Sequence, residues 1–160
     1  MNRYFIAVEI PEKTKEDIFS FFYKKLDKKI TGKFVDKEKL HITLLFLGDF
    51  EIKKELIDFI KEMKFSIPIN IKGIGAFPSI KNPKTIYARV HGNLNEHYEK
   101  LCSFLSMKKE SNFTPHVTLC RAKQVIDKID EKEFESNDFS FIADSLHIFN
   151  SDFSNYYRII

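Results

Sequence analysis

The chain is poor in cysteine and has no long apolar run. Only two cysteines, Cys102 and Cys120, occur among 160 residues, and they do not form a CxxC pair. Two thiols are too few for a disulfide scaffold in a chain of this length, so we expect reduced, buried cysteines and a cytoplasmic protein. The longest apolar runs, such as residues 42–47, are far shorter than the ~20 residues that a membrane helix requires. Charges from Arg3 onward also argue against a secretory leader, and we expect no membrane partner.

Several sequence patterns that bind phosphates, cofactors or metals are missing as well. The chain contains no GxxxxGK[ST] loop, no GxSxG elbow and no GxGxxG fingerprint. Their absence excludes the P-loop triphosphatases, the hydrolases with a nucleophile elbow and the dinucleotide-binding enzymes. A zinc site would need three or four ligands, usually closely spaced as in HxxxH or CxxC, and neither spacing occurs. We therefore expect no metal and no other cofactor.

The composition that is present indicates one folded domain with a mild positive charge. Hydrophobic residues make up 43% of the chain and 17 residues are phenylalanine, which is ample for a core. The net charge of +3 favours a polyanionic partner without requiring one. Only four of the 26 basic residues are arginines, namely Arg3, Arg89, Arg121 and Arg158. No linker rich in Pro, Gly or Ser divides the sequence, so we expect a single domain over residues 1–160.

Hydrophobic periodicity predicts an alternation of strands and helices. Alternating patterns predict strands at residues 3–9, 40–47, 67–71, 86–90, 114–121, 139–143 and 147–160, the last interrupted by a turn at 150–155. Helical spacing predicts helices over residues 12–26, 52–63 and 94–105, with Gly32 as the stop of the first, and a short helical segment within 124–133. A turn-rich loop is expected at 73–83. Because the strand connections are short enough for antiparallel pairing, we predict an α+β fold rather than a doubly wound parallel sheet.

A short motif occurs twice, each time inside a predicted strand. The sequence HITL at residues 41–44 recurs as HVTL at residues 116–119. Residues two apart on a strand share a face, so each HxT motif places an imidazole beside a hydroxyl. Two such motifs among five histidines are difficult to explain as packing. The other three histidines lack a hydroxyl partner of this kind, and we expect them to be structural.

Two HxT motifs facing one cleft would supply the groups that open a 2',3'-cyclic phosphate. One of His41 and His116 can take a proton from water while the other protonates the departing ribose oxygen. The hydroxyls of Thr43 and Thr118 can donate hydrogen bonds to the phosphate oxygens. Arg121 lies five residues after His116, so strict alternation puts its side chain on the opposite face. It can join the site only if the strand twists or bulges, or if its long side chain curls round.

With these motifs in view, the sequence resembles the 2H phosphoesterase superfamily, and within it the RNA 2',3'-cyclic phosphodiesterases, also called 2'-5' RNA ligases. The resemblance spans nearly the whole chain. Its blocks are RYFIAVEIPE, LHITLLFLGD, GIGAFPS, FTPHVTLCRA and SLHIFNSDFSNYYRII.

The resemblance implies a bilobal fold of two pseudo-symmetric α+β lobes, in which each lobe brings one HxT motif to a central cleft. It implies that His41 protonates the leaving 3' oxygen, that His116 activates water, and that the product carries a 2'-phosphate. Thr43 and Thr118 would then hold the phosphate. Arg121 matches the arginine that extends the second motif in this family. Phe46 would contribute to the nucleotide surface, or alternatively pack in the core.

Other functions remain open from the sequence alone, among them the hydrolysis of a different cyclic phosphate by the same two histidines. A single-stranded RNA-binding protein of the same fold, catalytically silent, would need no proton donor. The reverse reaction, joining RNA ends through a 2'-5' linkage, would use the same two histidines. In each case the expected partner is RNA or a nucleotide, with cyclic phosphate ends such as those of tRNA fragments for the enzyme. We take a monomer as the default.

Overall fold

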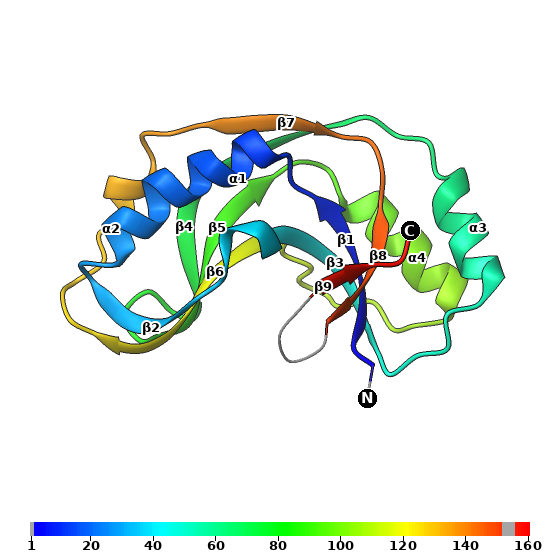
Figure 1. Cartoon of the computed structure of the whole chain (residues 1–160), viewed down its shortest axis with the longest axis horizontal. Helices are drawn as coiled ribbons and strands as arrows, with labels where there is room; N and C mark the ends of the chain where they lie inside the picture. Colours follow the sequence, from blue (N-terminus) through cyan, green and yellow to red (C-terminus); the bar gives the residue numbers. More distant parts are fainter. Residues whose placement is uncertain (1, 152–155) are drawn as a thin grey trace.

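The computed structural model, which describes residues 2–151 and 156–160, contains two antiparallel sheets (Figure 1). The four-stranded sheet has the order β3-β1-β8-β9 and the five-stranded sheet the order β2-β6-β5-β4-β7. Every strand pair is antiparallel. The prediction of an α+β fold built on two antiparallel lobes is confirmed.

The strands and helices follow the predicted order with several changes of boundary. The first sheet contains β1 (Tyr4–Glu9), β3 (His41–Gly48), β8 (His147–Ser151) and β9 (Tyr156–Arg158). The second contains β2 (Ile30–Phe34), β4 (Ile67–Pro78), β5 (Pro83–His91), β6 (His116–Val125) and β7 (Phe139–Ala143). The helices are α1 (Glu12–Ile18), a π-helical turn (Phe19–Tyr23), α2 (Lys24–Leu26), α3 (Lys54–Glu62) and α4 (Asn95–Leu105), with 3₁₀ turns at Lys37–Lys39 and Glu131–Phe134.

The chain passes between the two sheets several times. The first sheet combines β1 and β3 with β8 and β9 from the other end of the sequence, while β2 belongs to the second sheet. In Figure 1, α1 and α2 lie beside the five-stranded sheet, and α3 and α4 lie on the side of the four-stranded sheet. An aromatic cluster fixes the first helical segment, because Phe22 stacks on Phe134 at 5.9 Å and Phe21 meets the edge of Phe139 at 6.0 Å. Each lobe therefore depends on residues from distant parts of the chain.

Three boundaries differ from those expected from the sequence. Gly32 does not stop the first helical segment; it lies inside β2, a strand that the periodicity did not reveal. The expected loop at 73–83 is mostly strand, since β4 continues to Pro78 and β5 begins at Pro83. The segment 124–133 is not helical apart from the start of the turn Glu131–Phe134. Ring contacts and sheet pairing, rather than local propensity, decide these segments. The expected turn at 150–155 lies largely outside the described residues.

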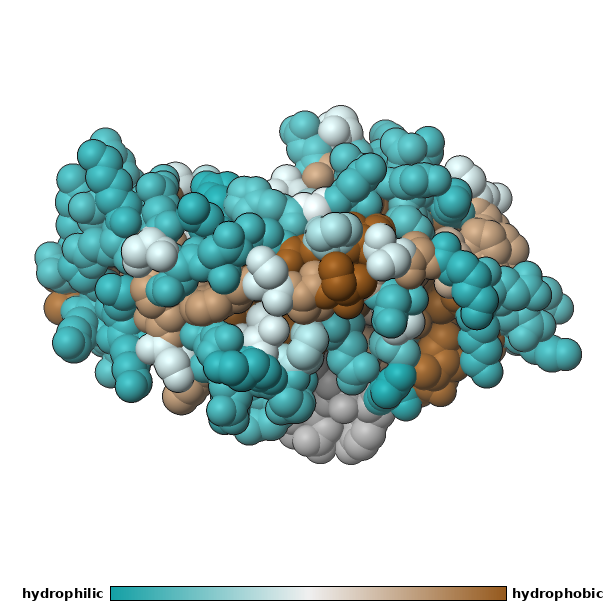
Figure 2. Space-filling model, turned by 90° about the horizontal axis from the view of Figure 1, so that it is seen from above, coloured by the Kyte–Doolittle hydropathy of each residue, from teal (hydrophilic) through white to brown (hydrophobic). Residues whose placement is uncertain are grey.

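The surface is mostly hydrophilic. Figure 2 shows hydrophilic side chains over both ends of one face, with a narrower apolar band across its middle. The edge strand β7 exposes Ile142, at 57% of its surface. Among residues 2–151 and 156–160, the structure contains no helix with the length and apolar character needed to cross a bilayer. Both cysteines are buried, as expected, and burial raises the pKa of the Cys120 thiol to about 11.

Substitution of Gly32 by alanine is expected to lower the free energy of unfolding by about 1–3 kcal/mol, the usual cost of overpacking. An added Cβ would collide with the carbonyl oxygen of Arg121 and lie 2.9 Å from the Cα of Ala122, so β2 and β6 would have to separate. Urea denaturation measures the change. The matched control is Lys33→Ala on the same strand, where the side chain is exposed. An unfolding free energy of Gly32→Ala equal to that of the control would contradict this packing.

Candidate active site

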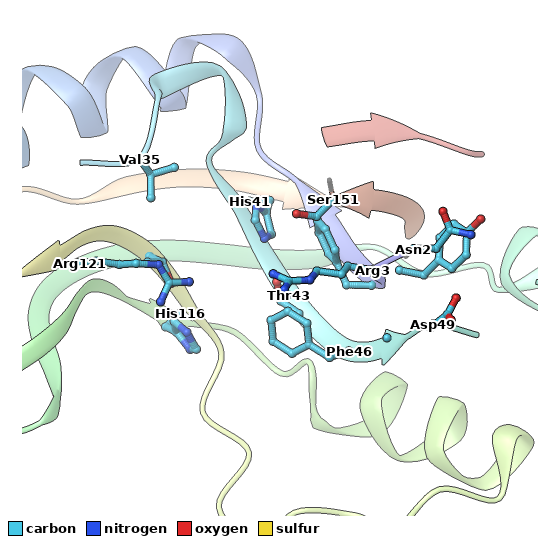
Figure 3. Close-up of a pocket in the computed structure, with 14 residues that line it drawn as sticks. Asn2, Arg3, Val35, His41, Thr43, Phe46, Asp49, His116, Arg121 and Ser151 are labelled. Carbon is cyan, nitrogen blue, oxygen red and sulfur yellow. The ribbon is translucent and has the colours of Figure 1, made fainter. Parts of the chain in front are cut away.

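The two HxT strands meet at one pocket. Strand β3 of the first sheet contacts β6 of the second, and a pocket of about 490 Å³ opens beside them (Figure 3). All six residues predicted from the sequence line this pocket: His41, Thr43, Phe46, His116, Thr118 and Arg121. The pocket is completed by residues that the sequence did not single out, which are Asn2, Arg3, Tyr4, Phe5, Val35, Gly48, Asp49 and Ser151. The structure thus brings together two motifs that are 75 residues apart in the chain, from 41 to 116.

The same irregularity follows the motif in both strands. In the pairing of β1 with β3, Ala7 pairs with Thr43 and the preceding residue Ile6 pairs with Leu45. Leu44 is therefore an extra residue in β3. In the pairing of β5 with β6, Tyr87 pairs with Thr118 and the preceding residue Ile86 pairs with Cys120. Leu119 is therefore an extra residue in β6. Both strands accordingly bury two consecutive residues, with half-buried positions before them and an exposed position after. A β-bulge of this kind moves the residues beyond it to the other face of the strand.

The bulges place Phe46 and Arg121 on the same face as the histidines. Strict alternation predicts that Arg121 lies on the face of the strand away from His116. The bulge shifts the alternation by one residue, so Arg121 lies on the same face as His116. The two residues occupy equivalent positions, each five residues after its histidine. Phe46 is 71% exposed, so the alternative that it packs in the core is wrong. Its ring lies at the pocket, 6.1 Å from the ring of Phe5.

The two imidazoles are held in the same way. Nδ1 of His41 lies 2.7 Å from the carbonyl oxygen of Lys39, and Nδ1 of His116 lies 2.8 Å from that of Thr114. A carbonyl oxygen only accepts, so Nδ1 carries the hydrogen and donates in each case. This leaves Nε2 of each ring as the nitrogen that can exchange a proton with a substrate.

Aromatic rings surround both imidazoles. The ring of Phe5 lies 4.8 Å from that of His41, and the rings of Tyr87 and Phe77 lie 5.1 Å and 5.4 Å from that of His116. Burial, with smaller contributions from the nearby His116 and Lys15, lowers the pKa of His41 to about 4, against the opposing effect of its hydrogen bond to the carbonyl of Lys39. In the free protein His41 is therefore neutral at pH 7.

The polar groups of the pocket suit an anionic phosphate. Two imidazoles, two threonine side chains and two arginines, Arg3 and Arg121, line one cavity. Within residues 2–151 and 156–160, the structure contains no cluster of three or more histidine, cysteine, aspartate or glutamate residues that could hold a metal ion. The sequence missed Arg3 because it lies far from both motifs and carries no motif of its own. Two signals were available: the scarcity of arginine in a lysine-rich chain, and the place of Arg3 at the start of the block RYFIAVEIPE.

Two antiparallel lobes, each carrying one HxT strand to a common pocket, define the class of the two-histidine phosphoesterases. A family model described as LigT like phosphoesterase matches residues 8–87, and the chain belongs to this family.

Curated relatives and solved structures agree with this assignment. An RNA 2',3'-cyclic phosphodiesterase of Methanocaldococcus jannaschii is 38% identical over 134 residues, covering 79% of this chain and 75% of that protein. The enzyme of the same name from Aquifex aeolicus is 38% identical over 114 residues, covering 62% of this chain and 60% of that protein. The crystal structure of E. coli LigT in its apo form shares the fold, with a TM-score of 0.75 at 19% identity over 99% of this chain and 95% of that one.

Occupation of the pocket by inorganic phosphate is expected to raise the pKa of His41 well above about 4, because a nearby anion stabilises the imidazolium. NMR titration of the imidazole nitrogens, with and without phosphate, measures both values, and His91, which lies outside the pocket, is the internal control. A free-protein pKa at or above 6.5 would contradict the burial of His41.

Since the pKa of His41 in the folded state lies below 6.5, the contribution of His41 to the free energy of unfolding is expected to fall as the pH drops from about 6.5 towards 4.

Proposed function

We propose that the chain hydrolyses RNA 2',3'-cyclic phosphate ends to 2'-phosphates, with His41 and His116 as acid and base. The observation that carries the proposal is that both HxT strands contribute their histidine and threonine to one pocket. Relatives named RNA 2',3'-cyclic phosphodiesterase support the choice of substrate. The expected substrates are RNA or nucleotides with 2',3'-cyclic phosphate ends, including tRNA fragments.

The proposed reaction proceeds in line at phosphorus. His116, neutral at Nε2, takes a proton from water as the water oxygen bonds to phosphorus. The bond from phosphorus to the 3' oxygen breaks, and His41 donates its proton to that oxygen. The phosphate stays on the 2' oxygen, and the two histidines end in exchanged protonation states. Thr43, Thr118 and Arg121 hold the phosphate oxygens on which negative charge increases.

The low pKa of His41 has a direct consequence for this mechanism. An acid must be protonated, whereas His41 in the free protein has a pKa of about 4. The negative charge of a bound cyclic phosphate favours the imidazolium, so the substrate itself would help to protonate its acid. The acid is thereby available mainly when substrate is present.

Substitution of either histidine by alanine is expected to lower kcat on a 2',3'-cyclic mononucleotide by about 10²- to 10⁴-fold, the usual contribution of one acid or base. The assay is run with a chelator, and the position of the product phosphate is read by phosphorus NMR. His91→Ala, outside the pocket, is the control and should retain activity.

The outcomes separate the alternatives. Unchanged rates in both histidine variants would show that the roles are wrongly assigned. Binding of single-stranded RNA without turnover would favour the catalytically silent RNA-binding protein. A 5'-hydroxyl that replaces water as the nucleophile would give a 2'-5' linkage by the same proton transfers, and ligation of RNA ends tests this activity separately.

Phe46 is proposed to stack on the base of the terminal nucleotide. Its ring is exposed at the pocket, where a base attached to the reacting ribose can reach it. Because stacking on one base contributes about 1–3 kcal/mol, Phe46→Ala is expected to raise KM by roughly 5- to 150-fold, with kcat much less affected. Steady-state kinetics on a cyclic mononucleotide measure this. Ile126→Ala, which removes another exposed apolar side chain away from the pocket, is the control. An unchanged KM in Phe46→Ala would rule out the stacking role.

A further inference from the structure

Arginine is scarce in this chain, and two of its four arginines line the pocket. Of 26 basic residues only four are arginines. Arg3 and Arg121 line the pocket, Arg158 lines a smaller pocket that shares His41, and Arg89 faces His116 across β5 and β6. Lysine elsewhere carries the positive charge of the surface. Arginine differs from lysine in its planar fork, which binds two oxygens of a phosphate at once.

The two motif strands are equivalent, but only one of them carries a cation at the position after its bulge. Arg121 follows the second bulge, and at the same position after the first bulge stands Phe46. The first motif strand therefore offers a ring where the second offers a guanidinium. The neighbouring strand β1 begins beside this position, with Tyr4 paired to Gly48 and Phe5 paired to Phe46. Arg3 precedes Tyr4 and lies in the same pocket.

The side chains of Arg3 and Arg121 extend into the pocket from opposite sides. Figure 3 shows their guanidinium groups directed towards each other across the space beside Thr43 and His41. The backbone of Arg3 is fixed by the first sheet: its carbonyl oxygen accepts a hydrogen bond of 2.9 Å from the amide of Ser151, and its amide donates one of 3.2 Å to Oδ1 of Asn150. The side chain thus starts from an anchored position.

We infer that Arg3 is a second phosphate-binding arginine, which holds the reacting phosphate from the side of the first motif, opposite Arg121. The inference rests on the proposed function for the identity of the phosphate. A cyclic phosphate has two non-bridging oxygens, and the attack of water increases the negative charge that they share. One guanidinium on each side would stabilise both. The two half-sites then differ in the origin of the cation. In the second half-site the cation is Arg121, on the motif strand β6. In the first it is Arg3, beside β1, and Phe46 occupies the equivalent position of the motif strand β3.

Arg3→Gln is expected to lower kcat/KM on a 2',3'-cyclic mononucleotide by about 100-fold, the loss typical of removing one donor to a developing oxyanion. Arg3→Lys, which keeps the charge and loses the fork, should fall between this variant and the wild type. Lys64→Ala, which removes one exposed positive charge from the loop after α3, is the matched control and should keep wild-type kinetics. A mononucleotide is used because it carries only the reacting phosphate. Wild-type kcat/KM in Arg3→Gln on this substrate overturns the inference, even if an oligonucleotide reacts more slowly, because Arg3 would then hold a neighbouring phosphate.

A second measurement separates phosphate binding from a purely structural role. Inorganic phosphate is titrated into the wild type, Arg3→Gln and Arg3→Lys, and the unfolding midpoint of each variant is recorded. The inference predicts that folded Arg3→Gln binds phosphate at least about tenfold more weakly, the effect of one lost charged hydrogen bond. Unchanged phosphate affinity would overturn it, whatever the rate. If the wild type binds phosphate but does not hydrolyse cyclic phosphates, the proposed function is disproved. The phosphate affinities of the wild type and Arg3→Gln then decide whether Arg3 binds phosphate.

Discussion

The bulge that follows each HxT motif is the constraint on which the pocket depends. In β3 and in β6, two consecutive residues are buried, and the first of them is bypassed in the pairing with the neighbouring strand. Without this step, period-two alternation would turn Phe46 and Arg121 away from the histidines. Burial of the apolar pairs Leu44–Leu45 and Leu119–Cys120 compensates for the interrupted ladder. The same apolar pattern in two distant strands therefore builds two half-sites with equivalent geometry.

Desolvation and charge act in opposite directions on His41. Its burial beside Phe5 disfavours the imidazolium, and an anionic substrate would favour it. Burial thus keeps the ring neutral in the free protein, while its hydrogen bond to the Lys39 carbonyl fixes which nitrogen can exchange a proton. His116 is oriented by an equivalent bond to the Thr114 carbonyl. The two rings are oriented by equivalent hydrogen bonds but have different neighbouring side chains. This difference is a physical basis for different roles.

Much of the fold and of the candidate site could be predicted, and the failures have identifiable causes. The strands of the two motifs and the helices near 54–62 and 95–105 follow hydrophobic periodicity. Strand β2 was missed because its pattern is interrupted by Gly32, which is required where β2 approaches the backbone of Arg121 and Ala122. The strand segments at 73–78 and 83–85 were missed because turn-forming residues are held there by pairing between β4 and β5. Location in the cytoplasm and a monomeric state stay predictions.

The sequence by itself determined the candidate catalytic groups, because the two HxT motifs present them as four residues of fixed spacing: His41, Thr43, His116 and Thr118. The tertiary structure alone decided that β3 and β6 meet at one pocket, that Arg121 and Phe46 face it, and that Arg3 reaches it from β1. The reason is physical. Spacing along a strand defines which neighbours share a face, whereas bulges and the pairing of distant strands depend on burial that no local pattern contains.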